Sequence, residues 1–288
     1  PIMNQTFTFI LLISLAFWLP TASADSLDRA LAAYAEHDIE KAVAILDNLA
    51  TNDDKHALMY LVKFQMRSGS AKKALRATKR LIKKYPDDPD AHHAYGLANL
   101  TMMSEVSVFR FVSMAKQAKA GWEKAVELDP DHLNGLYALF SYYANAPKIG
   151  GGDIEQARLL QARMADIDMG YGYLALGVLQ TKAEQFEEAE AAFIETTKIM
   201  DTAGAYFALA QFYLEQEQFT KALDAISNFS TKSADFWDPH ASIEYLVVAR
   251  AQAGLGHIEA AEAAAETGLT MKPGKRMRNF FEQTLKEL

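Results

Sequence analysis

The segment Phe186-Glu187-Glu188-Ala189 opens a stretch with helical periodicity, and similar segments return along the chain. Among them are Ile39-Glu40-Lys41-Ala42, Ile154-Glu155-Gln156-Ala157 and Phe219-Thr220-Lys221-Ala222. Each carries a small residue at one fixed place, and the alanines at that place are Ala42, Ala74, Ala118, Ala157, Ala189, Ala222 and Ala261. The intervals between them are 32, 44, 39, 32, 33 and 39 residues. Self-similarity at such a period indicates a stack of repeated helix pairs.

This pattern resembles the tetratricopeptide repeat, whose period is about 34 residues, interrupted by insertions. The resemblance covers nearly all of residues 26–273. Other positions agree with it: small residues at Ala30, Gly96, Gly177, Ala210 and Ala249, aromatic residues at Trp122, Tyr143, Phe193 and Tyr213, and helix-ending prolines at Pro86, Pro130 and Pro273.

The resemblance implies an all-α fold, a right-handed superhelical solenoid of about seven helix pairs that occupies residues 25–288 as one domain. A solenoid of this kind needs a terminal helix with one polar face to close its open end. Residues 275–288 fit that part, with an apolar face made of Met277, Phe280, Phe281, Leu285 and Leu288.

Insertions interrupt the repeat at about residues 101–116, 146–152 and 230–239, and in solenoids they often mark a binding edge. In the first, Met102, Met103, Val106, Phe109, Phe111, Val112 and Met114 either pack on two lengthened helices or form an exposed docking surface. The second holds Gly150 to Gly152, which predict a turn with positive φ before a helix capped by Asp153 and Gln156. It also looks like an insertion found in exported bacterial tetratricopeptide proteins of unassigned function.

Residues 1–24 have the layout of a signal peptide. An apolar run of 13 residues from Phe7 to Leu19 is followed by Pro20 and by Ala22-Ser23-Ala24. A membrane-spanning helix needs about 20 residues, so cleavage after Ala24 is favoured over a retained anchor. The expected location is the periplasm or the exterior, and the alternative is an inner-membrane protein anchored by an uncleaved signal.

Composition excludes several classes of function. The net charge of -8 argues against a general nucleic-acid binder. The sequence has no cysteine, which excludes disulfides, thiolate metal sites and a lipid anchor on cysteine.

Motifs for catalysis, metals or cofactors are not supported by their surroundings. Gly150 to Gly152 lack the Lys-Ser/Thr of a phosphate loop, and Gly170-Tyr171-Gly172 follows a helical pattern instead of the strand that a dinucleotide site requires. We expect those glycines to separate two helix pairs. Asp88, Asp90, His92 and His93 are the one dense group of metal-ligand types, but adjacent histidines point to different helix faces. We expect no catalytic residue, no metal and no cofactor.

Two surfaces are candidates for binding. Residues 55–84 contain ten Lys or Arg and no acidic residue. Seven of these cations belong to one helix, which is expected on the convex side. We call them the basic patch: Lys72, Lys73, Arg76, Lys79, Arg80, Lys83 and Lys84. It is either a solvated face or a contact for an anionic envelope surface. The resemblance places a second set on the concave groove: His93, Tyr137, Ser141, Leu174, Phe207, Gln211 and Arg250.

These features predict a non-catalytic scaffold or adaptor of the bacterial cell envelope that binds an unidentified protein or peptide in the groove. A periplasmic small-molecule or transporter-associated binding protein is the alternative, favoured by a closed apolar pocket with convergent polar groups. Buried ionisable groups with shifted pKa values would favour an enzyme. Self-association stays open.

Overall fold

The computed structural model describes residues 22–50, 54–232 and 240–288, and within these ranges it contains fifteen α-helices and no strand. The first eight are α1 (Ala22–Ala35), α2 (Ile39–Leu49), α3 (Lys55–Arg67), α4 (Ala71–Lys84), α5 (Pro89–Met102), α6 (Val108–Leu128), α7 (Leu133–Asn145) and α8 (Ile154–Ile167). The others are α9 (Met169–Lys182), α10 (Phe186–Met200), α11 (Ala203–Glu215), α12 (Phe219–Ile226), α13 (Ser242–Gly254), α14 (Ile258–Thr270) and α15 (Lys275–Glu287). Short 3-10 turns are η2 (Met103–Glu105), η3 (Lys148–Gly150) and η4 (Phe229–Thr231).

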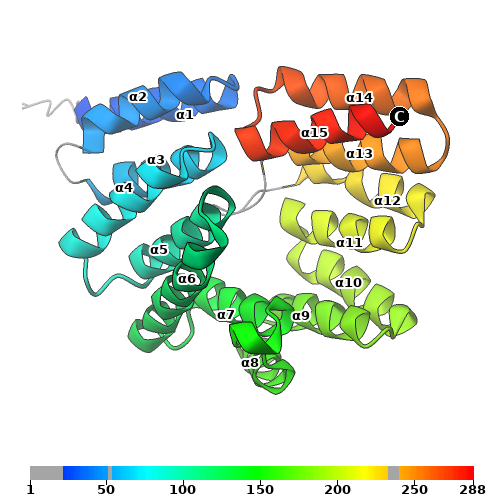
Figure 1. Cartoon of the computed structure of the whole chain (residues 1–288), viewed down its shortest axis with the longest axis horizontal. Coiled ribbons are helices and arrows are strands. Elements are labelled where there is room, and N and C mark those ends of the chain that lie inside the picture. The colour runs from blue at the N-terminus through cyan, green and yellow to red at the C-terminus, as the bar shows by residue number, and fades with distance from the viewer. Residues whose placement is uncertain (1–21, 51–53, 233–239) are drawn as a thin grey trace, which may run out of the picture.

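The helices form a solenoid, because each packs mainly on its neighbours in sequence. From α1 with α2 to α13 with α14 there are seven pairs in the described residues, and α15 follows them. Figure 1 shows the pairs turning around an almost closed circuit, in which blue α1 and α2 approach orange and red α14 and α15. The predicted all-α solenoid of about seven pairs with a terminal helix is confirmed.

Aspartate side chains start five of the helices. Asp38, Asp54, Asp88, Asp153 and Asp168 accept hydrogen bonds from backbone N–H groups in the first turns of α2, α3, α5, α8 and α9. Each such cap stabilises its helix by about 1 kcal/mol. The predicted cap at Asp153 accepts from the N–H of Gln156, but the N–H of Asp153 donates to the carbonyl of Tyr143, so the Gln156 side chain does not complete a capping box.

Small residues let the two helices of a pair approach closely. The seven alanines at the repeated position are at most 1% exposed. Where the first helix carries glycine, an aromatic ring of the second fills the space: a Cβ at Gly177 would come within 2.8 Å of Phe193 Cζ, and one at Gly96 would overlap the indole of Trp122. The sequence marks these positions as small and as aromatic, and the structure shows that Gly96 with Trp122 and Gly177 with Phe193 meet within one pair.

The terminal helix α15 covers the last pair. Phe281 is fully buried and its ring touches Gly268 of α14, while Met277 and Leu285 pack on the same core. Phe280 differs from the prediction: it is 42% exposed, and the guanidinium of Arg276 lies over its ring. The buried face of α15 is narrower than its sequence indicates.

Gly170 and Gly172 do not separate two helix pairs, contrary to the prediction. Both lie inside α9 and are buried. A Cβ at Gly172 would come within 2.6 Å of Ala165 Cα, so the glycine lets α8 and α9 pack closely. The break falls at Asp168, which ends α8 and caps α9.

The insertions take three forms. The first lengthens α6, which has 21 residues, and its Met102 and Met114 pack with Leu75 of α4. The second is a tight turn in which Gly151 has the predicted positive φ, 91°. The third begins in η4 and continues into residues 233–239, which lie outside the described residues, as do residues 1–21 of the predicted signal peptide.

The first two repeats touch the last repeat and α15. The backbone at Gly274 comes so close to the carbonyl of Arg67 that no Cβ would fit, and Gly69 lies against Lys275. His240, before α13, packs its ring edge against Tyr34 of α1 at 5.8 Å between centroids. Arg67 joins this contact, since its guanidinium donates a hydrogen bond to the Tyr34 hydroxyl. The circuit of helices is thus closed.

Substituting Gly96 with alanine tests the close crossing. The added Cβ would collide with the Trp122 ring, and we expect the free energy of unfolding to fall by about 1–3 kcal/mol in urea denaturation. Gly150→Ala is the matched control, because its Cβ meets nothing closer than 3.4 Å. Equal stability of both variants would contradict this packing.

Acid should weaken the closure through His240. Burial and the nearby Arg67 and His37 lower its pKa from 6.5 to about 4. As the pH falls, the imidazole of His240 is protonated in the unfolded chain at a higher pH than in the folded chain. The stability that neutral His240 contributes is therefore lost as the pH falls from 6.5 to about 4. We expect the free energy of unfolding of His240→Asn to depend less steeply on pH over this range; an unchanged slope would refute the role of His240.

Candidate functional site

A pocket of about 530 Å³ opens on the inner side of α7, α9 and α11. Pockets for small ligands or side chains of a partner typically measure about 300–1,000 Å³. Apolar atoms make up most of its surface, with Leu174, Val178, Met200, Phe207 and Ala208 among the contributors. The inner surface is therefore shaped to hold an apolar group.

Four of the predicted groove residues meet in this pocket, and they are Tyr137, Leu174, Phe207 and Gln211. Ser141, one turn after Tyr137, forms a hydrogen bond with the hydroxyl of Tyr137. Burial raises the pKa of Tyr137, and the hydrogen bond with Ser141 acts in the opposite direction. Arg250 is exposed on α13 and does not line the pocket.

His93 does not face the groove, contrary to the prediction. It is only 4% exposed, because the start of α7 covers it with His132, whose ring packs edge-on at 5.7 Å. Burial, and secondarily the charge of His132, lower the pKa of His93 to about 3, although Asp90 acts the other way. His93 is thus a neutral core residue at neutral pH.

The pocket has a polar rim. The hydroxyl of Tyr171 donates to Asn134 Oδ1 at 3.3 Å, and Gln211 Nε2 donates to Glu215 Oε1 at 3.0 Å. Thr181 and Asn145 also contribute, each donating to a carbonyl of its own helix. Such groups orient a bound ligand more than they attract it.

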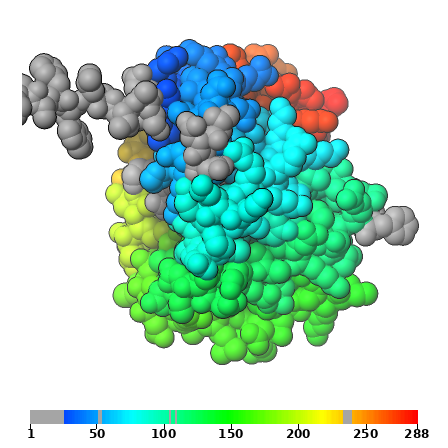
Figure 2. Space-filling view, turned by 90° about the vertical axis from the view of Figure 1, so that its left-hand side faces the viewer, coloured from blue at the N-terminus to red at the C-terminus, as the bar shows by residue number. Residues whose placement is uncertain are grey.

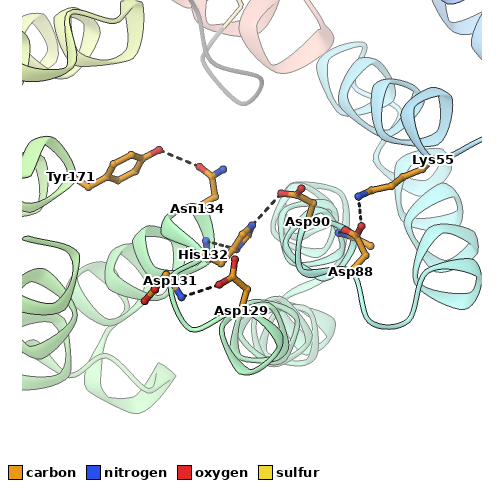
Figure 3. Close-up of polar contacts among 10 residues, drawn as sticks. Lys55, Asp88, Asp90, Asp129, Asp131, His132, Asn134 and Tyr171 are labelled. Carbon is orange, nitrogen blue, oxygen red and sulfur yellow. Dashed lines mark hydrogen bonds and ion pairs between the residues drawn. The ribbon is translucent and has the colours of Figure 1, made fainter. Parts of the chain in front are cut away.

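Further polar pairs lie at the starts of α3, α5 and α7 (Figure 3). Lys55 pairs with Asp88, and His132 Nε2 lies 3.1 Å from Asp90. Because His132 Nδ1 accepts the backbone N–H of Gly135, its proton sits on Nε2 and is donated to Asp90. This hydrogen bond is the main cause of the lowered pKa of Asp90.

The group Asp88, Asp90, His92 and His93 does not converge on a metal ion. Asp88 caps α5 and pairs with Lys55, His92 contacts the carbonyl of Pro86 at 2.7 Å, and His93 is buried. Within the described ranges no cluster of histidine and carboxylate side chains could hold a metal.

The ionisable groups of the pocket lining are Tyr137, Tyr171, Lys182 and Glu215. Raising the pKa of Tyr137 makes its hydroxyl a weaker acid, which is the opposite of activation for proton transfer at neutral pH. The lining offers apolar contact, hydrogen bonds, an exposed cation at Lys182 and an exposed carboxylate at Glu215.

The predicted basic patch lies on α4, and all seven of its side chains are exposed while Ala71, Ala74, Ala77, Thr78 and Leu81 are buried. Arg80 also donates to the carbonyl of Ala50 at 2.6 Å. In Figure 2 the cyan surface that includes α4 faces the viewer, on the outer side of the circuit. The patch and the pocket are thus on different faces.

Several lining residues were missed from the sequence. Val178 and Lys182 follow Leu174 at intervals of four on α9, and Glu215 follows Gln211 on α11. Residues four apart share one helix face, so this spacing could have extended the predicted set. Met200 gave no such signal, because it ends α10, a second helix.

Comparison with known proteins agrees with the repeat. Residues 33–98 match the family model described as "Tetratricopeptide repeat". No curated protein shows significant sequence similarity to this chain.

Solved structures share the fold at low sequence identity. A tetratricopeptide repeat protein from Parabacteroides merdae is 14% identical, with a TM-score of 0.54 over 92% of this chain and 97% of that one. The APC/C hetero-tetramer Cut9-Hcn1 is 16% identical, with a TM-score of 0.52 over 87% of this chain and 46% of that one. The human IFIT1 dimer with PPP-AAAA is 19% identical, with a TM-score of 0.52 over 86% of this chain and 54% of that one. The chain thus spans about half the length of the latter two.

Proposed function

We propose that this chain is a non-catalytic interaction module that holds a segment of another protein on its inner face. The observation that carries the proposal is the pocket between α7, α9 and α11, where Tyr137, Leu174, Phe207 and Gln211 meet. Solenoids use their concave surfaces to bind extended partners, and tetratricopeptide repeats generally mediate contacts between proteins.

The pocket suits one apolar anchor of a peptide or helix. Phe207 and Leu174 supply the apolar walls, and Tyr137 packs edge-on against Tyr171 at 6.0 Å, which fixes both rings before a partner arrives. A rigid aromatic site loses little side-chain entropy on binding, and such anchors carry most of the binding energy in interfaces. The rim at Asn134 and Gln211 can hydrogen bond to the backbone of the bound segment.

The place of action that we propose is the bacterial cell envelope, in the periplasm or outside the cell after cleavage of residues 1–24. The apolar run from Phe7 to Leu19 and the small residues Ala22 to Ala24 support it. Among the described residues, no helix combines the length and the hydropathy that a membrane span requires. Anchoring by an uncleaved signal is the alternative.

A displayed library of random peptides, screened for binding to the chain, tests the groove. We expect selected peptides to share an apolar anchor and to bind the double variant Leu174→Ser, Phe207→Ser at least about tenfold more weakly by fluorescence anisotropy. The matched control is Leu159→Ser, Ile199→Ser, since both side chains are exposed on α8 and α10 and lie outside the pocket. Circular dichroism must show all three proteins folded.

Equal affinity of the selected peptides for the groove variant and the control would place the binding surface elsewhere. Failure to select any peptide would count against a peptide ligand.

A small apolar molecule is a second candidate, favoured by the volume of the pocket and by the closed circuit of helices around it. Native mass spectrometry of the purified chain should then show an added mass of a few hundred daltons. Ala208→Phe, which places a ring in the pocket, should remove that mass. An unliganded spectrum for the unmodified chain contradicts this candidate.

A further inference from the structure

We propose that the outer face formed by α4 and the first turns of α6 docks on the surface of a lipid bilayer that contains anionic lipid. This face lies apart from the inner pocket and does not depend on the function proposed for it.

The charge on this face has one sign. Lys72, Lys73, Arg76, Lys79 and Lys83 are exposed on α4. None of the five forms an ion pair within the part of the chain that the structure describes. Free lysine and arginine near an anionic membrane contribute about 1 kcal/mol each to its attraction.

The beginning of α6 is also positively charged. Arg110 and Lys116 are exposed, and the first acidic residue of this helix is Glu123. The segment from residue 55 to 84 carries ten cations and no acid in a chain whose net charge is -8. The positive charge is therefore concentrated on one face, and attraction to an anionic surface would orient the protein with this face toward that surface.

The hairpin of α5 and α6 carries exposed apolar side chains. Phe111 is 46% exposed and Val112 56%, and Leu100 at the end of α5 is 47% exposed. They belong to the hairpin of α5 and α6, which is joined to the basic helix through Leu75: Leu75 packs with Met103 and Met114 of that hairpin. On α4, Leu75 lies one turn from Lys72 and Lys79, so the hairpin packs on α4 within one turn of these cations.

A bilayer is the occupant that this combination favours over an acidic protein. The cations run along the whole of α4, and the surface that includes α4 lies on the outer side of the circuit (Figure 2). Side chains such as Phe111 and Val112 can enter the headgroup region while lysines pair with phosphates, which is how amphipathic surfaces bind membranes without crossing them.

Cosedimentation of the full chain with vesicles tests the proposal. Vesicles of phosphatidylcholine with one third phosphatidylglycerol are compared with phosphatidylcholine alone, which measures the contribution of any other apolar segment. We expect binding to the anionic vesicles to be stronger, and to weaken about tenfold to hundredfold in the variant Lys72→Gln, Lys79→Gln, Lys83→Gln. The variant Phe111→Ser, Val112→Ser should weaken it severalfold.

The matched control, Lys41→Gln, Arg278→Gln, Lys286→Gln, changes three exposed cations on other helices and should bind as the unmodified chain does. Circular dichroism and an unchanged midpoint of urea unfolding establish that each variant is folded. Equal binding to both kinds of vesicle, or equal binding by the basic-face variant and the control, overturns the proposal. Loss in the lysine variant with no loss in the Phe111, Val112 variant also overturns it, and reassigns the face to an acidic protein.

Discussion

Close contact between small residues is the constraint on which this solenoid depends. Ala42, Ala189 and their equivalents are buried at the crossing of each pair, where any larger side chain would push two backbones apart. The tilt of each pair fixes the direction of the next, so an error at one crossing would displace every later repeat. The inner pocket exists because three successive crossings aim α7, α9 and α11 at the same space.

Where the first helix of a pair carries glycine instead of alanine, the two helices still pack closely, but through an aromatic ring. On the first helices, Gly96 and Gly177 occupy the small position that holds alanine in other repeats, and the missing Cβ admits the rings of Trp122 and Phe193. The aromatic ring replaces the contact that the absent methyl group would have made. The small position of the first helix therefore holds either glycine or alanine, and both glycines meet an aromatic ring.

The fold was predictable from the sequence because its cause is local and repeated. The seven alanines mark seven second helices, and Asp153 with Gln156 marks a helix start, in patterns that need no knowledge of distant contacts. The site was predictable only in part. Positions such as Leu174 and Phe207 follow from helix periodicity, whereas the burial of His93 depends on His132, which lies in another repeat. Contacts between the first and last repeats, such as Tyr34 with His240, have no signature in the sequence at all.

Closure of the circuit changes what kind of folding unit the protein is. An open solenoid behaves as a one-dimensional array whose ends fray independently, because each repeat senses only its neighbours. Here the carbonyl of Arg67 meets Gly274 and the ring of Tyr34 meets His240, so the two ends of the described solenoid are tied to each other. The joined segments are about 200 residues apart in sequence, which raises the contact order and places their docking among the late, slow events of folding. Hydrogen exchange in the terminal repeats should therefore be as slow as in the middle, a cooperativity that belongs to globular domains.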